Sequence, residues 1–142
     1  MPDIAIRTNK LTRDFGSVRA LDNLTLEVPK GTVFGFLGPN GAGKTTTIQL
    51  LLGLLEPTAG QAEVLGFDTS AEAEQIRRIT GALLEHSGLY ERLSAEDNLK
   101  FYGRIWHLDE VSLQKRVEEL LIHLGLYDRR RESVGTWSRG MR

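Results

Sequence analysis

Eight consecutive residues, at positions 38–45, have the types and spacing of a phosphate-binding loop. They read glycine, four residues, and then Gly-Lys-Thr. Glycines let the backbone curl until successive N–H groups point into one concavity, and a helix that follows adds the positive end of its dipole. A triphosphate fits such a concavity, so the motif predicts binding of a nucleoside triphosphate.

Three side chains at the end of the motif could complete this site. Lys44 can reach the outer phosphates as a point charge, and the Thr45 hydroxyl is placed to ligate the Mg²⁺ that accompanies them. Thr46 adds a second hydroxyl. We therefore expect the phosphates to be bound by Gly38, Pro39, Asn40, Gly41, Ala42, Gly43, Lys44, Thr45 and Thr46, with Thr45 as a metal ligand.

The residues on both sides of the loop must position it. The apolar run at 32–37 is typical of a buried strand, and Ile48, Leu51, Leu52 and Leu55 would form one face of a helix after the loop. The alternative is a glycine-rich turn before a helix that carries Lys-Thr by chance. Because both flanks match, the sequence favours the phosphate-binding loop.

The rest of the chain divides by its hydrophobic pattern. The first half predicts strands over residues 4–8, 24–28, 61–65 and 81–84, and a short surface helix over 71–79. In the second half, Ser94 with Asp97 resembles a capping box that opens a helix. Its core face would carry Leu99, Tyr102 and Trp106, with Phe101 and Ile105 beside it. A second helix, closed by Gly125, would bury Leu113, Val117, Leu120, Leu121 and Leu124.

Composition excludes several functional classes. The chain has 142 residues, a net charge of −1 and no cysteine, so it has no disulfide framework, thiolate nucleophile or cysteine-bound metal. The near-neutral charge argues against a nucleic-acid partner, and the arginines at 129–131 are expected in a solvated loop or helix end. No apolar run approaches membrane-spanning length, and the N-terminus lacks the apolar core of a signal peptide. His86, His107 and His123 lack metal-ligand spacing.

Several motifs in order resemble those of the ATP-binding cassette (ABC) family of transporter ATPases, and the resemblance covers the whole chain. Phe15, before Gly16, looks like the aromatic residue that stacks on adenine in that family. Residues 83–85, followed by 88–90 and 96–99, look like the Q-loop and the start of the helical subdomain. Residues 137–141, Trp-Ser-Arg-Gly-Met, stand in the place of the signature usually written Leu-Ser-Gly-Gly-Gln.

Two of these motifs depart from the family pattern. The Q-loop usually has glutamine where this chain has Glu85, whose carboxylate could ligate Mg²⁺ but would add negative charge near the γ-phosphate. In the signature, Ser138, Arg139 and Gly140 would contact the ATP held by an opposite subunit, with Ser138 capping the helix that follows. The structural alternatives are an exposed strand-end glutamate, a core or turn Phe15, and an ordinary turn at 138–140.

The resemblance implies an α/β fold in which residues 1–142 are the N-terminal part of one ABC ATPase domain. A P-loop NTPase core with an antiparallel strand region would occupy about residues 1–87, and a helical subdomain about 88–142. The Walker B carboxylates, the switch histidine and the strands that flank residues 32–37 are expected beyond Arg142, so the fold would be incomplete at the C-terminus. The pair Asp109-Glu110 is better explained as a helix N-cap than as a Walker B substitute.

The motifs resemble the drug-export branch most. The resemblance implies that two such domains sandwich two Mg·ATP and that hydrolysis drives a membrane-spanning permease subunit or domain. The chain would then work in the cytoplasm, at the inner face of the cell membrane. Two other interpretations stay open: a nucleotide-binding fragment that does not hydrolyse ATP, and another P-loop NTPase, such as a small-molecule kinase or a non-transport ABC ATPase.

Overall fold

A computed structural model describes residues 3–83, 88–138 and 140–141. The chain forms two compact units, Met1–Ala82 and Leu83–Arg142, and each is described by itself. In the described residues, the first unit holds a sheet and two helices, and the second holds two helices and two short 3-10 helices. The predicted change from strands to helices along the chain is therefore present in the structure.

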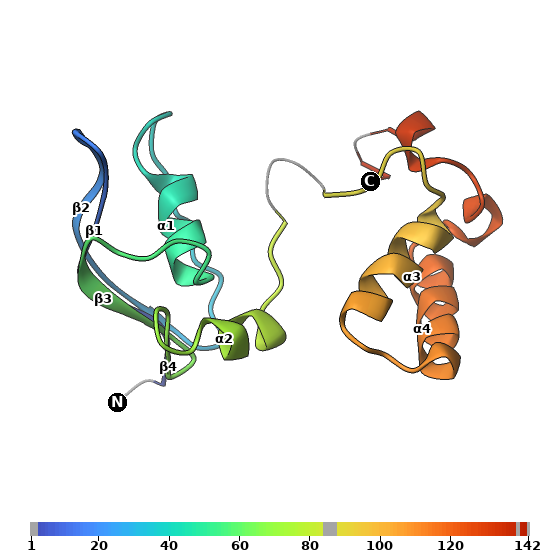
Figure 1. The fold of residues 1–142 in the computed structure, drawn as a ribbon, viewed down its shortest axis with the longest axis horizontal. Helices are drawn as coiled ribbons and strands as arrows, with labels where there is room; N and C mark the ends of the chain where they lie inside the picture. The colour runs from blue at the N-terminus through green and yellow to red at the C-terminus, as the bar shows by residue number, and fades with distance from the viewer. Residues whose placement is uncertain (1–2, 84–87, 139, 142) are drawn as a thin grey trace. The chain divides into compact units, whose positions relative to one another are not determined.

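The sheet of the first unit is antiparallel, with its described strands in the order β2-β1-β3-β4 (Figure 1). β1 (Ile4–Phe15) and β2 (Val18–Pro29) form a long hairpin. β3 (Ala59–Val64) pairs with the other side of β1, and a short β4 (Phe67–Asp68) follows. The strands predicted over 4–8, 24–28 and 61–65 are confirmed, although β1 and β2 extend well beyond the alternating residues.

Helix α1 (Lys44–Leu51) packs on this sheet through a small apolar core. Thr47 and Leu50 are its buried residues, whereas Ile48 is 39% exposed. The predicted face was therefore partly wrong, because contact with the sheet is made one position away from the expected stripe. The buried cluster consists of Leu11, Leu21, Leu50 and Ala62, with Leu24, Leu51 and Leu55 packed against it.

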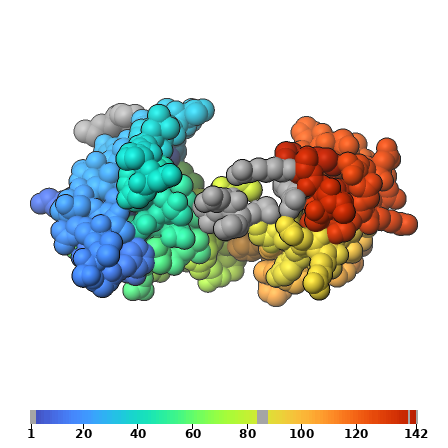
Figure 2. Space-filling view, turned by 90° about the horizontal axis from the view of Figure 1, so that it is seen from above, coloured from blue at the N-terminus to red at the C-terminus, as the bar shows by residue number. Residues whose placement is uncertain are grey.

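Two predicted strands are absent from the described structure. Residues 32–37 have no regular secondary structure, and Val33 and Leu37 are almost fully exposed. Residues 81–83 are likewise irregular, Leu83 is exposed, and Leu84 lies outside the described residues. An apolar sequence becomes a strand only when a neighbour supplies ladder hydrogen bonds, and none of the described strands pairs with either segment. Figure 2 shows the first of these segments, in light blue to cyan, at the surface of the first unit.

Helix α2 (Ala73–Ile79) confirms the short surface helix predicted over 71–79. It begins two residues later because the Asp68 carboxylate accepts hydrogen bonds from the backbone N–H groups of Ser70 and Ala71, both at 2.8 Å. These bonds form a turn that precedes the helix. Ile76, which is fully buried, anchors the helix to the first unit.

The second unit is built on α3 (Ala95–Ile105) and α4 (Glu110–His123), followed by the 3-10 helices η1 (Tyr127–Arg129) and η2 (Val134–Thr136). Both predicted caps are confirmed: the Ser94 hydroxyl accepts from the Asp97 N–H at 3.0 Å, and the Asp109 carboxylate accepts from the Ser112 N–H at 2.9 Å. Gly125, with φ 68°, follows the end of α4 as predicted. The core consists of Ala95, Leu113, Val117, Leu121, Val134 and Trp137.

The core face predicted for α3 was largely wrong. Leu99 does pack against the core, but Tyr102 is 37% and Trp106 is 53% exposed. Phe101 and Ile105, expected beside that face, are also exposed, as is Leu124 after α4. Instead, α3 turns Ala95, Asn98 and Gly103 inward. Polar contacts decide this rotation, because the buried Asn98 amide exchanges hydrogen bonds with the backbone of Tyr90, a pairing that hydrophobic periodicity does not encode.

Candidate nucleotide-binding site

The loop at 38–45 has the backbone conformation that a phosphate cradle needs. Gly41 and Gly43 adopt left-handed φ values of 84° and 80°, and Gly43 is the N-cap of α1. A Cβ on Gly43 would lie 2.4 Å from the Ala20 carbonyl oxygen on β2. A side chain is therefore excluded at Gly43 by both conformation and space, and the loop is held against the sheet where the helix begins.

Lys44 bends back over the loop. Its Nζ donates to the carbonyl oxygens of Gly38 at 2.7 Å and Pro39 at 2.6 Å. The ammonium is thereby held against the loop, at the N-terminal end of α1, where anions are favoured. The exposed Thr45 and the half-buried Thr46 follow it, whereas the Thr47 hydroxyl is used internally, donating to the Gly43 carbonyl at 2.9 Å.

The polar groups of this loop fit a bound Mg²⁺ ion. The ion prefers oxygen ligands, keeps several waters, and usually binds through one or two protein groups together with substrate phosphates. The exposed Thr45 hydroxyl could serve as such an oxygen ligand. Within the ranges that the structure describes, no group of three or more histidine, aspartate or glutamate side chains could hold a metal by itself. Glu85, the other predicted metal ligand, lies outside the described residues.

Phe15 ends β1, at the turn that leads into β2. The turn passes through Gly16 with φ 59°, and Phe15 pairs with Val18 across the hairpin. Its side chain is 44% exposed, so it is not a core residue. The turn lies at the same end of the first unit as the loop before α1 (Figure 1). The Arg13 guanidinium lies over the Phe15 ring, 4.6 Å from its centroid.

The signature-like segment lies in the second unit. Trp137 is buried in the core and Ser138 is exposed, and no helix is described after Ser138, so the cap expected there stays a prediction. The Met141 N–H donates to the Ser138 carbonyl at 3.0 Å, so these residues and Gly140 form a turn, while Arg139 lies outside the described residues. A helix needs several successive backbone hydrogen bonds, and the described residues of this segment form only this turn.

Charged residues hold both flanks of that segment. Arg129 pairs with Glu132 at 2.6 Å and donates to the Met141 sulfur at 3.5 Å. Trp137 Nε1 donates to the same Glu132 carboxylate at 3.3 Å. The hydrogen bond from Arg129, with a further one from Trp137, holds the pKa of Glu132 below its ordinary value. The arginines at 129–131 were expected to be solvated. One of them, Arg129, instead supports the turn at 138–141 through its contacts with Met141 and Glu132.

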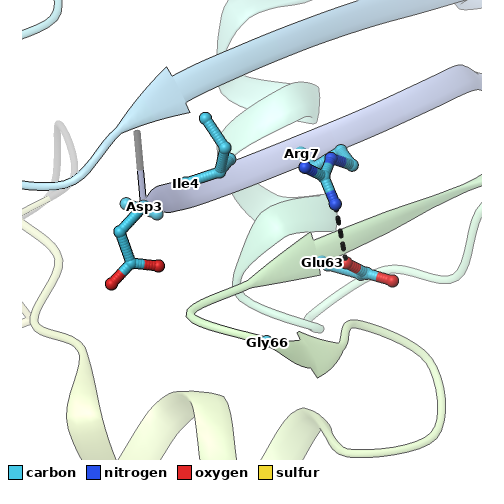
Figure 3. Close-up of a pocket in the computed structure, with 6 residues that line it drawn as sticks. Asp3, Ile4, Arg7, Glu63 and Gly66 are labelled. Atoms are coloured by element: carbon cyan, nitrogen blue, oxygen red, sulfur yellow. Dashed lines mark ion pairs between the residues drawn. The ribbon is translucent and has the colours of Figure 1, made fainter. Parts of the chain in front are cut away.

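A separate hollow of about 230 Å³ lies at the opposite end of β1, around its first residues (Figure 3). Arg7 there is balanced by Glu27 at 2.8 Å and Glu63 at 4.0 Å. Its charge is thus satisfied within the protein, and the hollow includes none of the predicted site residues. The lining residues are Asp3, Ile4, Ala5, Arg7, Glu63 and Gly66.

Sequence reasoning missed Arg13 and the carbonyl of Glu56 to which it donates at 2.8 Å. A signal for Arg13 was available, because residues two apart on a strand share a face and Arg13 precedes Phe15 by two. Glu56 carried no such signal, since its role depends on where the connection between α1 and β3 runs.

A glycine-bent loop that opens a helix beside a sheet defines a P-loop protein with an α/β fold, as predicted. A family model described as "ABC transporter" matches residues 21–142. The chain therefore belongs to the ABC transporter family, which confirms the resemblance carried by its motifs.

Individual relatives agree with that assignment. The chain is 44% identical over 142 residues to the daunorubicin resistance ATP-binding protein DrrA3 of Streptomyces coeruleorubidus, covering 100% of this chain and 45% of that protein. It is 39% identical over 139 residues to the bacitracin transport ATP-binding protein BcrA of Bacillus licheniformis, covering 96% and 44%. The chain thus spans less than half the length of these curated relatives.

A solved structure described as the ATP binding subunit of an ABC transporter matches with a TM-score of 0.79. It is 29% identical and is matched over 96% of this chain and 57% of its own. Among the helices of the described residues, none combines the length and the apolar character needed to cross a membrane.

Proposed function

We propose that residues 1–142 are the N-terminal part of the ATP-binding domain of an ABC exporter, and that they bind Mg·ATP. The observation that carries the proposal is the loop at 38–45, where two left-handed glycines lead into α1 and the Lys44 ammonium donates back to the carbonyl oxygens of Gly38 and Pro39. About residues 1–87 would form the nucleotide-binding core and about 88–142 the helical subdomain. The division of the chain into two compact units between Ala82 and Leu83 supports such a boundary.

Each site residue has a definite role in this proposal. Residues 38–43 surround the phosphates with backbone N–H groups, Lys44 neutralises their charge, and Thr45 and Thr46 supply hydroxyls. Phe15 stacks on the adenine. Bound Mg²⁺ would neutralise and orient the phosphate oxygens, with Thr45 and Glu85 as the protein groups that could ligate it. Hydrolysis in the whole protein would rest mainly on this positioning and charge neutralisation.

We further propose two partners for the whole protein. One is a second ATPase domain, whose ATP would be contacted by Ser138, Arg139 and Gly140. The exposed Ser138 and the turn that follows it are compatible with this contact. The other is a membrane-spanning permease, which would hold the chain at the cytoplasmic face of the cell membrane. The names of the relatives, which refer to daunorubicin resistance and bacitracin transport, support an exporter.

An exposed aromatic group in the second unit is a candidate contact surface for a partner. The rings of Tyr90 and Phe101 meet edge-to-face at 4.9 Å, and those of Phe101 and Tyr102 at 5.4 Å. Their side chains are 50%, 38% and 37% exposed, respectively. Contiguous exposed apolar surface can mark an interaction site, and these three neighbouring rings form such a surface.

The proposal is tested by titrating residues 1–142 and the Lys44→Ala variant with Mg·ATP. Loss of a charged hydrogen bond costs about 1.5–3 kcal/mol, so affinity should fall roughly ten- to a hundredfold. Lys115→Ala is the matched control, because Lys115 is an exposed lysine on α4 whose ion pair with Glu119 is long, at 4.0 Å. Equal affinity of the wild type and Lys44→Ala would refute the site.

A further inference from the structure

Arg13 is held in place from two directions. Its Nη1 donates to the Glu56 carbonyl at 2.8 Å. Its backbone neighbours are tied to the same connection, because the Thr58 N–H donates to the Thr12 carbonyl and the Asp14 N–H donates to the Thr58 hydroxyl, both at 2.9 Å. The segment 56–58 follows α1 and leads into β3, so Arg13 is braced by the chain that leaves the helix of the phosphate-binding loop.

The charge of Arg13 is directed at the Phe15 ring and not at a carboxylate. Asp14 is paired with Arg19 at 2.9 Å, and among the described residues no ion pair involves Arg13. The Nε of Arg13 is shielded from solvent and has no hydrogen-bond partner among the described residues. A cation–π contact becomes stronger when the cation is desolvated, and the 4.6 Å separation from the ring centroid is within its range.

The contact with Arg13 limits where a ligand could stack on Phe15. The guanidinium covers one face of the ring, and the side chain is still 44% exposed. A planar base can then stack only on the opposite face. We propose that Arg13 is a positioning residue for nucleotide binding, which fixes the orientation of the Phe15 ring so that a purine stacks on the face opposite the guanidinium. The inference rests on the proposed ATP site and adds a residue to it.

The test is a double-mutant cycle on residues 1–142, with ATP and inorganic triphosphate as probes. Arg13→Met removes the cation and keeps a similar length, Arg13→Lys keeps a cation, and Phe15→Ala removes the ring. Arg13→Met should weaken ATP binding by at least about two- to fivefold, because that loss corresponds to an exposed cation–π contact and the Arg13 guanidinium is partly desolvated. It should leave triphosphate binding unchanged, and Arg13→Lys should retain most of the affinity for ATP.

The decisive measurement is the effect of Arg13→Met in the Phe15→Ala background. If Arg13 acts through the ring, it should cause no further loss of ATP affinity there, because coupled residues are not additive. An equal loss in both backgrounds, or a parallel loss of triphosphate binding, would overturn the proposal and make Arg13 a purely structural residue. Unchanged ATP affinity in Arg13→Met or in Phe15→Ala would also overturn it. The proposed ATP site is tested separately, by measuring whether Lys44→Ala weakens the binding of inorganic triphosphate.

Discussion

Replacing Gly43 by alanine should damage the first unit more than the same change at Gly41. Both glycines are left-handed, with φ 80° and 84°, and an alanine in that region costs about 1–2 kcal/mol. At Gly41 the new methyl group would meet nothing within 4 Å. At Gly43 it would lie 2.4 Å from the Ala20 carbonyl oxygen, and backbone of a paired strand cannot withdraw cheaply. Overpacking of this kind adds about 1–3 kcal/mol, so Gly43→Ala should cost about 2–5 kcal/mol in total.

The assay must report on the first unit, and both tryptophans, Trp106 and Trp137, lie in the second. Amide hydrogen exchange of β2 and α1 in the wild type and the two variants meets this requirement. Gly43→Ala should lower protection in both elements and also abolish triphosphate binding, while Gly41→Ala should lower protection less. Equal loss in the two variants would refute the reasoning, because it would mean that the contact with Ala20 has no energetic consequence.

Three further predictions concern the two units separately. Phe15→Ala should weaken ATP about fivefold or more and spare inorganic triphosphate in parallel titrations, because base stacking contributes about 1–3 kcal/mol; equal weakening of both ligands would assign Phe15 a structural role. Ser94→Ala should lower the free energy of unfolding of the second unit by about 1 kcal/mol, measured by tryptophan fluorescence in denaturant, while Ser94→Thr keeps a capping hydroxyl and should lose less. The hydrogen bond from Lys100, with the charges of Lys100, Arg130 and Arg131, holds the pKa of Glu96 below its ordinary value despite partial burial. This contribution to stability is therefore present above the unfolded pKa of about 4.3 and is lost as the pH falls through the lower folded value. Glu96→Gln should flatten that acid limb in unfolding curves recorded at a series of pH values, and an unchanged limb would contradict the assignment.

Local features of the chain could be predicted from the sequence because their causes are local. The left-handed conformation of Gly41 and Gly43 follows from residue type and motif spacing. The caps at Ser94 and Asp109 need only a side-chain oxygen and an N–H three residues later. The strands of the hairpin could be located because the alternation of apolar residues is also a local feature, although the pairing of β1 with β2 set their full length.

Features that depend on partners distant in sequence could not be predicted. Residues 32–37 are apolar like a buried strand, but a strand is a property of at least two chain segments, and none of the described strands pairs with them. The rotation of α3 depends on the hydrogen bonds of Asn98 with Tyr90, which outweigh the pattern of its aromatic residues.

The site shows the same division. The residue types and spacing at 38–46 were sufficient to predict a phosphate-binding loop, since backbone N–H groups and the Lys44 charge come from one continuous segment. Only the tertiary structure placed the Ala20 carbonyl against Gly43 and the Glu56 carbonyl against Arg13. Backbone carbonyls are common to every residue type, so their role is decided by where the fold brings the chain and leaves no mark in the sequence.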